Sequence, residues 1–305
     1  MTAAATGAVC ARGRLLACLC ALFAEARALR LPSALVSAEW LRRHRQEVHL
    51  YDVTQTLDRE ANTVEPALDG FVSERIPGAS FIDVPNGLSD SSRHSTAAGV
   101  LLHNMCPSAS AFASELARLG ISLARASEGG PPIVLYSSEH VMWATRVWWM
   151  LHSFGLEGRV AVLDGGLEAW KAAGGELARG VDETGCGGAT VATAGAGTSA
   201  GVGSARDFRK GSFVDVDHVL RLVAKRTAST AVTAPLLIDS LKRSSFDGTA
   251  PSRYGRRGHI SGAVSVPYAS VLDGAGCFLP AATIRRAFEA GGARLTEDPA
   301  TIVVY

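Results

Sequence analysis

The chain repeats one pattern of strands and turns, and this repeat limits the folds that it can form. The first copy has a short apolar strand at 48–52, the turn Ile76-Pro77-Gly78-Ala79 and a strand at 132–136. The second copy has a strand at 236–239, the turn His259-Ile260-Ser261-Gly262-Ala263 and a strand at 301–305. Short apolar runs alternating with helical patterns are typical of parallel sheets that helices cover on both faces. The sequence therefore predicts an α/β chain made of two related units.

The two copies differ in how far they extend. After its strand at 132–136, the first copy continues through a loop, a helix at 141–154, a strand at 160–163 and a helix at 167–173. The second copy ends at Tyr305, in the strand that matches 132–136. We therefore expect the second unit to be incomplete in this sequence, and the chain to be part of a longer protein.

Composition predicts where the units begin and end. Residues 185–203 consist almost entirely of Gly, Ala, Thr, Ser and Val without a period, as in flexible linkers. We expect four regions, which are a targeting or disordered segment at 1–34, the first unit at 35–177, the linker at 178–212 and the second unit at 213–305.

Local patterns predict several further elements. Ser37 is a good N-cap for a short helix, and residues 54–75 read as polar and irregular. A strand is expected at 81–84. Phe112, Leu116 and Leu119 share one face of a helix that Gly120 ends. In the second unit, helices are expected at 216–225, with Val219, Leu220 and Val223 on one face, and around Ile284 and Phe288.

The amino terminus has the composition of a targeting segment. Residues 1–24 contain no acidic residue, carry Arg12 and Arg14, and include an apolar run at 15–23 that is too short to span a bilayer. Ala24-Glu25-Ala26 resembles a secretory cleavage site, whereas the arginine-rich and acid-poor character fits a mitochondrial transit peptide. We expect a mitochondrial protein, with the secretory pathway and the cytoplasm as the open alternatives.

Charge and cysteine spacing argue against several classes of partner. The net charge of +1 gives no electrostatic ground for binding nucleic acid or acidic membranes. The six cysteines lack the spacing of a metal site. We expect no nucleic acid, no membrane span, no metal and no cofactor, and a monomer.

Four stretches of this chain carry a resemblance to a known family. They are the two turns at 76–79 and 259–263, the helical segment at 146–151 with Trp148 and Trp149, and the Leu-Asp-Gly-Gly segment at 163–170 that leads to Trp170. With these segments the chain resembles the tandem-domain sulfurtransferases, rhodanese (thiosulfate sulfurtransferase) and 3-mercaptopyruvate sulfurtransferase. The resemblance implies two tandem rhodanese-like domains, each a parallel sheet flanked by helices. It also implies an enzyme that moves a sulfane sulfur from thiosulfate or 3-mercaptopyruvate, through a cysteine persulfide, to a thiol or cyanide.

The resemblance also implies where the nucleophile belongs. The family carries its cysteine directly after the strand that matches 301–305, so we expect the nucleophile immediately after Tyr305, no catalytic residue in this chain, and no activity from these 305 residues alone. The first unit has Ser137, Ser138, Glu139 and His140 at the matching position. A serine forms no persulfide, and a pair of Ser137 as nucleophile and His140 as base lacks a third residue to orient it. The first loop is therefore expected to be degenerate.

Substrate binding is where the chain departs from the family. Family members place an arginine two residues after the aspartate that matches Asp239 and another four residues later, but those positions are Leu241 and Ser245. The cations that remain as candidates for an anionic donor are Arg243, Arg253, Arg256 and Arg257. By the same resemblance, His103 is the candidate for a first-unit histidine facing the cleft.

Two other functions stay open. The missing arginines favour a non-catalytic rhodanese-like module with a binding or regulatory role. A rhodanese-related phosphatase shares the domain, but it requires a longer loop in which cysteine and arginine stand six residues apart. The residues after Tyr305 distinguish the three.

Overall fold

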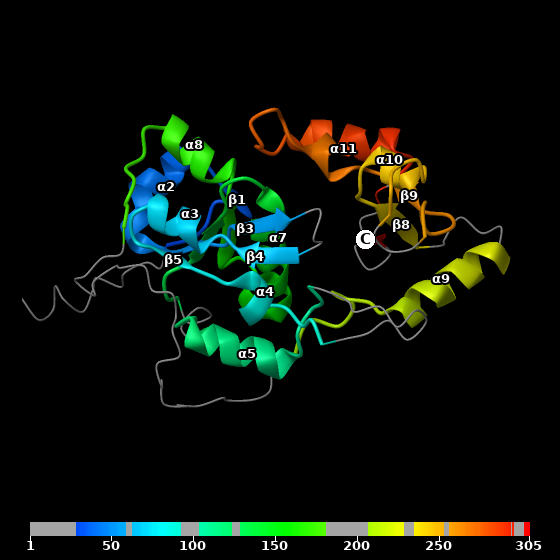
Figure 1. Cartoon of the computed structure of the whole chain (residues 1–305), viewed down its shortest axis with the longest axis horizontal. Helices are drawn as coiled ribbons and strands as arrows, with labels where there is room; N and C mark the ends of the chain where they lie inside the picture. The colour runs from blue at the N-terminus through cyan, green and yellow to red at the C-terminus, as the bar shows by residue number, and fades with distance from the viewer. Residues whose placement is uncertain are drawn as a thin grey trace, which may run out of the picture.

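The computed structural model in Figure 1 describes the chain in ranges separated by gaps, and all structural statements below concern those ranges. They are residues 29–58, 63–92, 104–123, 129–180, 207–228, 235–252, 256–293, 295 and 302–305. Most of the expected targeting segment, together with His103 and Arg253, lies outside the described residues. Within the described part of the chain, no helix has the length and apolar character needed to cross a membrane.

The first unit is built on a five-stranded sheet in which all neighbouring strands run parallel. The strand order is β1-β7-β6-β2-β5, so the amino-terminal strand pairs with the last strand of the unit. The strands are β1 (Leu35–Val36), β2 (His49–Asp52), β5 (Ala79–Phe81), β6 (Ile133–Tyr136) and β7 (Val160–Leu163). Every residue of β6 and β7 is buried, as expected for central strands of a sheet covered on both faces.

Alternate side chains of this sheet enter two separate cores. Leu135 belongs to the core that contains residues of α5 and α7, whereas Val134 belongs to the core that contains residues of α2, α3 and α8. This separation follows from the two-residue period of a strand. The helices are α2 (Ala38–His44), α3 (Leu68–Ser73), α4 (Val84–Gly87), α5 (Ala109–Arg118), α7 (Val141–Leu151) and α8 (Gly166–Ala172), with the short turns η1 (Arg45–Glu47) and η2 (His152–Leu156).

Several local predictions for this unit are confirmed. The Ser37 side chain caps α2 by accepting a hydrogen bond of 3.2 Å from the Trp40 amide. Phe112 and Leu116 are buried on α5, and Gly120 follows that helix with φ of +72°. These positions were predictable because capping and helical spacing depend on residues that are close in the sequence.

Two local predictions are wrong. Residues 54–75, expected to be irregular, contain the antiparallel hairpin of β3 (Gln55–Asp58) and β4 (Thr63–Pro66) and then α3. The strand expected at 81–84 ends at Phe81, and α4 begins at Val84. The physical reason is an N-cap, since the Asp83 carboxylate accepts a hydrogen bond of 3.1 Å from the Asn86 amide and starts a helix there.

The second unit reproduces the centre of the first sheet. Its three parallel strands, in the order β10-β8-β9, pair in the same way as β6-β2-β5. They are β8 (Leu236–Asp239), β9 (Val264–Ser265) and β10 (Ile302–Val304), with α10 (Arg243–Phe246), η3 (Tyr268–Val271) and α11 (Ala281–Ala290) around them. The hydrophobic core cluster described there contains only Ile238, Val266 and Ala293 as buried members. The repeat predicted from the sequence is therefore present, with far less burial in its second copy.

Helix α9 (Val216–Ala228) precedes β8 and is only partly covered (Figure 1). Leu222 is buried, but Val216 and Leu220 are 68% and 60% exposed. The helix predicted at 216–225 is thus present, and of its three predicted apolar positions Val219 and Val223 are half-buried whereas Leu220 is exposed.

The described end of the predicted linker packs on the first unit. The Phe208 ring lies 5.1 Å from Phe112 and 5.0 Å from Phe154, measured between ring centroids. The Arg209 amide donates a hydrogen bond of 2.8 Å to the Ser153 carbonyl, and the Trp149 indole donates to the Ser212 carbonyl at 3.1 Å. Residues 208–212 are thus held by the first unit, although the sequence placed them in the linker.

Candidate functional site

A buried hydrogen-bonded group lies at the carboxyl end of the central strands of the first unit. The Tyr136 hydroxyl hydrogen-bonds to Asp52, and it accepts a hydrogen bond of 3.3 Å from the Ile76 amide in the first Ile-Pro-Gly-Ala turn. Burial raises the pKa of Asp52, while hydrogen bonds from Thr54 and Tyr136 act in the opposite direction. We call Asp52, Tyr136 and the Ile76 amide the first clamp, because they join two strands to the turn.

The loop after Tyr136 is fixed to this clamp through Thr54. The Ser138 amide donates a hydrogen bond of 3.0 Å to the Thr54 hydroxyl, which in turn donates to the Asp52 carboxylate. The Ser137 hydroxyl donates at 2.8 Å to the backbone carbonyl of His140. Since the imidazole of His140 takes no part in this contact, the described geometry contains no nucleophile–base pair of Ser137 and His140.

Gly166 lets helix α8 approach the same loop closely. Its φ of +56° is left-handed, and a Cβ atom at this position would clash with the Ser137 carbonyl oxygen. That carbonyl accepts a hydrogen bond of 3.2 Å from the Leu167 amide. The Gly-Gly segment thus holds the start of α8 against the loop.

The second unit contains a matching clamp. The Tyr305 hydroxyl accepts a hydrogen bond of 2.9 Å from the Ile260 amide of the second turn, and it also hydrogen-bonds to Asp239. Burial is the main cause that raises the pKa of Tyr305 to about 12. The Leu241 amide donates to Asp239 at 2.8 Å, as the Thr54 amide donates to Asp52 at 2.8 Å. We call Asp239, Tyr305 and the Ile260 amide the second clamp.

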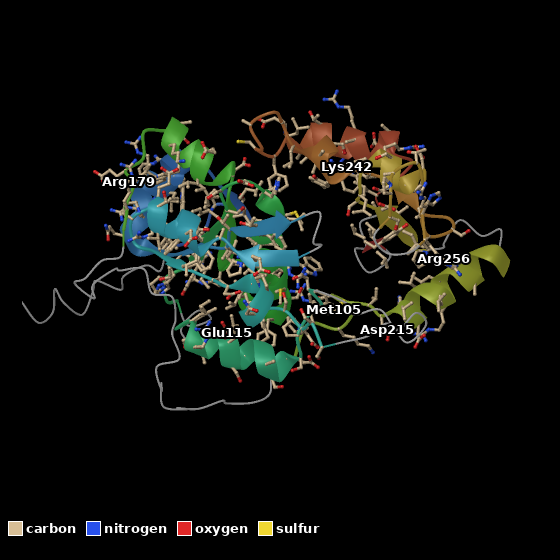
Figure 2. All side chains as sticks on the ribbon, in the orientation of Figure 1. Met105, Glu115, Arg179, Asp215, Lys242 and Arg256 are labelled. Atoms are coloured by element: carbon tan, nitrogen blue, oxygen red, sulfur yellow. The ribbon has the colours of Figure 1, made fainter. Side chains whose placement is uncertain are left out.

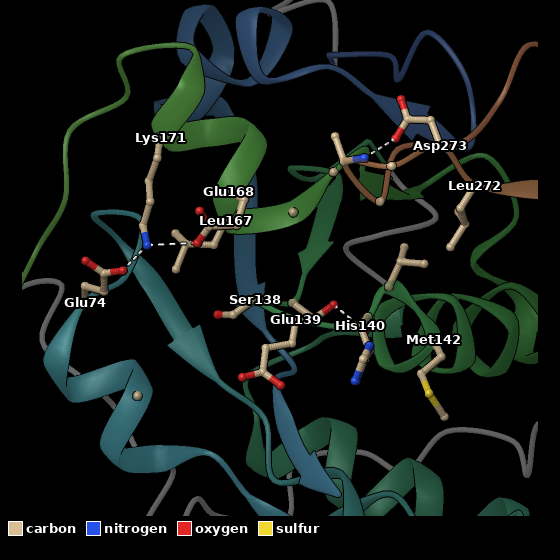
Figure 3. A pocket seen from close by; sticks show the side chains of 18 of the residues that line it. Glu74, Ser138, Glu139, His140, Met142, Leu167, Glu168, Lys171, Leu272 and Asp273 are labelled. Atoms are coloured by element: carbon tan, nitrogen blue, oxygen red, sulfur yellow. Dashed lines mark hydrogen bonds and ion pairs between the residues drawn. The ribbon is translucent and has the colours of Figure 1, made fainter. Parts of the chain in front are cut away.

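A cavity of about 800 Å³ lies between the first-unit loop and a segment of the second unit (Figure 3). The first unit lines it with residues 137–142, with residues 165–168 and Lys171 around α8, and with Gly70, Ser73 and Glu74. The second unit lines it with Tyr268 and residues 272–276. The two sides are joined where the Phe278 amide donates a hydrogen bond of 2.8 Å to the Asp164 carboxylate.

Hydrogen bonds also connect this cavity to the second clamp. The Tyr268 amide donates to the Ser240 carbonyl at 2.8 Å. The amide and the hydroxyl of Ser240 both donate to the Tyr305 carbonyl at 2.9 Å. Two successive hydrogen-bonded contacts, from Tyr268 to Ser240 and from Ser240 to Tyr305, therefore connect a wall of the cavity to the carboxyl end of β10.

The lining of this cavity is acidic. Glu74, Glu139, Glu168 and Asp273 contribute four carboxylates, and Lys171 contributes the one ammonium group among the lining residues that the structure describes. Lys171 is already paired with Glu74 and with Glu168, in the second case at 2.9 Å (Figure 3). The cavity is thus unsuited to an anion held by the side chains of its walls.

The predicted donor-binding cations lie outside this lining. Arg243 is 67% exposed in its side chain and forms an ion pair of 3.0 Å with Asp247, one turn along α10. Arg256 and Arg257 are exposed, and Figure 2 draws Arg256 in the same half of the molecule as Lys242, with the second unit. Of the predicted site residues, the structure brings Ser137, Ser138 and His140 to the cavity and leaves Arg243, Arg256 and Arg257 away from its walls.

Of the two described cysteines, Cys277 lies next to the cavity and is a poor nucleophile. The Cys277 sulfur lies close to α8, 2.6 Å from where a Cβ atom on Gly165 would stand. Burial and the carboxylates of Asp164 and Asp273 raise the pKa of Cys277, which disfavours the thiolate that a nucleophile requires. Neither Cys106 nor Cys277 forms a disulfide among the described residues. Within the described ranges, no three His, Cys, Asp or Glu side chains are grouped closely enough to hold a metal ion.

Comparison with known proteins assigns these features to a family. The family model for the rhodanese-like domain matches residues 37–173. Over 222 residues, the chain is 31% identical to thiosulfate/3-mercaptopyruvate sulfurtransferase 2 of Arabidopsis thaliana, which covers 70% of this chain and 58% of that protein. Residues 37–173 thus match a rhodanese-like domain, and the chain is similar to the tandem-domain sulfurtransferases. Its first unit is thus a rhodanese-like domain, and its second unit repeats the centre of that fold.

Solved structures and further relatives agree with this assignment. The crystal structure of SseA from Escherichia coli, which has the rhodanese fold of 3-mercaptopyruvate sulfotransferases, matches with a TM-score of 0.65 and 25% identity over 89% of this chain and 87% of that one. The putative thiosulfate sulfurtransferase SseB of Mycobacterium tuberculosis is 30% identical over 68% of this chain and 62% of its own length. The chain spans about three fifths of the length of the Arabidopsis relatives that it matches.

Sequence reasoning missed the second wall of the cavity. The segment 268–276 has no family motif, and its role depends on the contact of Phe278 with Asp164, which is 114 residues away. One local signal was available, because Asp273 accepts hydrogen bonds of 2.9 Å from the amides of Ala275 and Cys277, a pattern typical of an aspartate that begins a tight turn.

Proposed function

We propose that the complete protein is a sulfurtransferase that moves a sulfane sulfur from thiosulfate or 3-mercaptopyruvate to a thiophilic acceptor. The nucleophile is a cysteine placed directly after Tyr305, on the loop that corresponds to Ser137–His140 of the first unit. The observation that carries this proposal is the second clamp. It repeats the hydrogen bonds by which the first clamp presents a loop at the carboxyl end of the sheet, where α/β folds place their chemistry.

The proposed reaction has two displacement steps. The cysteine thiolate attacks the outer sulfur of thiosulfate, a new S–S bond forms, the original S–S bond breaks and sulfite leaves with the bonding electrons. The acceptor thiolate then attacks the outer sulfur of the cysteine persulfide, takes that sulfur and releases the cysteine thiolate. Each thiol loses its proton before it attacks, so backbone amides that stabilise a thiolate promote both steps.

The first unit has a supporting role in this proposal. Its loop offers serine hydroxyls, one of which is already bound to the His140 carbonyl, and it contains no thiol. The fixed loop and the start of α8 then serve as a wall of the cavity. The domain boundaries at 35–177, 178–212 and 213–305 belong to the same proposal.

Donor recognition is proposed to be weaker than in relatives that carry both arginines. Leu241 is 43% exposed and uncharged, and Ser245 supplies no positive charge. The arginines that remain as candidates are Arg243, Arg256 and Arg257, together with Arg253, which lies outside the described residues. Arg243 must leave Asp247 to contact a donor. An exposed ion pair of this kind is worth at most about 1 kcal/mol, so the exchange is feasible.

A second candidate function is a non-catalytic rhodanese-like module that binds or regulates a partner. The same absence of arginine at positions 241 and 245, together with the pairing of Arg243 with Asp247, favours it. A mitochondrial location is proposed on the composition of residues 1–24, and one relative of 28% identity has a mitochondrial name.

The deciding experiment is a kinetic assay of the complete protein. With thiosulfate or 3-mercaptopyruvate as donor, we expect transfer to cyanide or a thiol with a high KM for both donors. Charge removal in the triple variant Arg243→Gln, Arg256→Gln, Arg257→Gln should raise KM about threefold to tenfold. The effect on kcat should be smaller, because these contacts bind the donor equally in the ground state and in the transition state. The matched control is the α11 variant Arg285→Gln with Arg286→Gln, which should change neither constant. If neither thiosulfate nor 3-mercaptopyruvate supports sulfur transfer, the result would favour the non-catalytic binding module.

A further inference from the structure

The side chains that line the acidic cavity do not suit an anionic donor, and the cavity lies beside the proposed reaction centre. Its walls join the first-unit loop to Tyr268, and Tyr268 connects through Ser240 to the carbonyl of Tyr305. Its volume of about 800 Å³ is in the range of sites that hold small organic ligands. A ligand held there would be next to a cysteine that follows Tyr305.

The charges of the lining select the class of that ligand. Four carboxylates and one ammonium group give the lining a net charge of −3 when His140 is neutral. Two of the carboxylates, those of Glu74 and Glu168, share Lys171. An oxygen of Asp273 accepts from the amides of Ala275 and Cys277.

Glu139 differs from the other carboxylates of the lining. Its side chain is exposed, it has no hydrogen-bond or ion-pair partner among the described residues, and Figure 3 shows it beside Ser138 and His140 at the first-unit loop. A cation can therefore reach Glu139 without displacing any partner, whereas at Asp273 it finds one oxygen already bound to two backbone amides. A cationic ligand gains charge–charge attraction there, whereas an anionic ligand is repelled.

We propose that this cavity binds the sulfur acceptor, and that the favoured acceptor is a thiol carrying a positive charge, such as an aminothiol. The ammonium group contacts Glu139, and the thiol extends past Tyr268 toward the end of β10. The inference rests on the proposed sulfurtransferase function, and it adds the acceptor class. It also separates the two substrates by charge, since the anionic donor relies on the arginines after β8.

A binding experiment on the 305-residue chain tests the cavity independently of catalysis. Three small thiols serve as probes, the cationic cysteamine, the neutral 2-mercaptoethanol and the anionic 3-mercaptopropionate. The reporter is the methyl resonance of Met142, which lines the cavity, and the buried Met150 is the internal control. Cysteamine should shift the Met142 signal at a concentration at least threefold lower than 2-mercaptoethanol, 3-mercaptopropionate should bind weakest, and Met150 should not respond.

Variants make the test specific to Glu139. Glu139→Gln should weaken cysteamine binding about threefold to fivefold, the size of one exposed charge contact, and leave 2-mercaptoethanol unchanged. The control Glu176→Gln removes an exposed carboxylate outside the lining and should change nothing. Equal binding of the three thiols, or cysteamine binding that is insensitive to Glu139→Gln, would overturn the proposal.

A kinetic arm in the complete protein tests the acceptor role. With a fixed concentration of thiosulfate, kcat/KM should decrease from cysteamine to 2-mercaptoethanol to 3-mercaptopropionate when each is compared at an equal thiolate concentration, and Glu139→Gln should reduce this preference. If the thiols bind in that order but react without preference, the cavity does not hold the acceptor and that part of the proposal is wrong. If no thiol is converted, the sulfurtransferase function fails, and the binding arm still decides whether the cavity selects cations.

Discussion

The two clamps have the same hydrogen bonds in very different surroundings. In the first, Tyr136 and Ile76 are completely buried, and β6 is buried along its whole length. In the second, Tyr305 is only partly buried, and β10 ends with Val304 at 58% exposure. Local polar geometry at a strand end therefore does not depend on a large core. In the first unit the clamp supports a hydrogen-bonded loop on a five-stranded sheet, and in the second unit the matching geometry stands on a three-stranded sheet with fewer buried residues.

The largest expected difference between the two units concerns backbone protection. Because β2 and β6 lie between two cores, whereas the core cluster of β8 and its neighbours has three buried members, amide hydrogens of β2 and β6 should exchange orders of magnitude more slowly than those of β8 and β10. Hydrogen exchange measured by mass spectrometry on the 305-residue chain checks this. Limited proteolysis should leave a resistant piece of about residues 37–171, with cuts within 185–203. Equal protection or equal resistance of residues 213–305 would contradict this view of the two units.

A substitution at Gly166 should show how tightly the first loop is held. Gly166→Ala places a methyl group against the Ser137 carbonyl at a left-handed φ, and it should lower the free energy of unfolding by about 3 kcal/mol through strain and overpacking. Gly174→Ala is the matched control, because Gly174 also has a positive φ of +71° but has no atom within 4 Å of the added group. It should cost about 1 kcal/mol. Urea denaturation measures the free energy of unfolding of both variants. Equal losses would show that the close approach of α8 to the loop does not contribute to stability.

Removing the tyrosine hydroxyls should affect the clamps unequally. Tyr136→Phe leaves the buried Ile76 amide without its partner and removes one of the hydrogen bonds to Asp52, so it should cost about 1–3 kcal/mol of stability. Tyr305→Phe should cost less than about 1 kcal/mol, since water reaches the partly buried second clamp and replaces the hydroxyl. Chemical unfolding with a separate probe in each unit tests the comparison. A larger loss of unfolding free energy for Tyr305→Phe than for Tyr136→Phe would contradict the expected order.

The smallest expected effect is a difference in tyrosine ionisation. The pKa of Tyr305 is raised to about 12, mainly by burial, and that of Tyr136 is raised further by deeper burial and by Asp52. A raised folded-state pKa means that the stabilising contribution of Tyr305 is complete below the unfolded value of 10.0 and is lost as pH rises through about 12. NMR of tyrosines labelled with carbon-13 at Cζ should show Tyr305 titrating near 12 and Tyr136 still protonated there. Titration of Tyr305 near 10 would indicate that the second clamp is open in solution.

Much of the fold and part of the site follow from the sequence. The repeat predicted both sheets, and the alignment of Asp52 with Asp239 and of Tyr136 with Tyr305 was visible in the two copies. The hairpin of β3 and β4 was missed because its polar residues suit an exposed ribbon as well as a loop.

The cavity is the part that sequence reasoning could not supply. Its second wall depends on the long-range contact between Phe278 and Asp164, which no local pattern encodes. The pairing of Arg243 with Asp247 was accessible from its i,i+4 spacing, and it lowers the expectation that Arg243 is free to hold a donor.

We infer that sulfur chemistry belongs to the strand end of the second unit and not to the loop of the first. The most direct measurement is mass spectrometric mapping of the persulfide after treatment of the complete protein with thiosulfate or 3-mercaptopyruvate. We expect one added sulfur atom on a cysteine that follows Tyr305, and no stoichiometric addition to the 305-residue chain. A persulfide at full occupancy on Cys277 or Cys106 would contradict it.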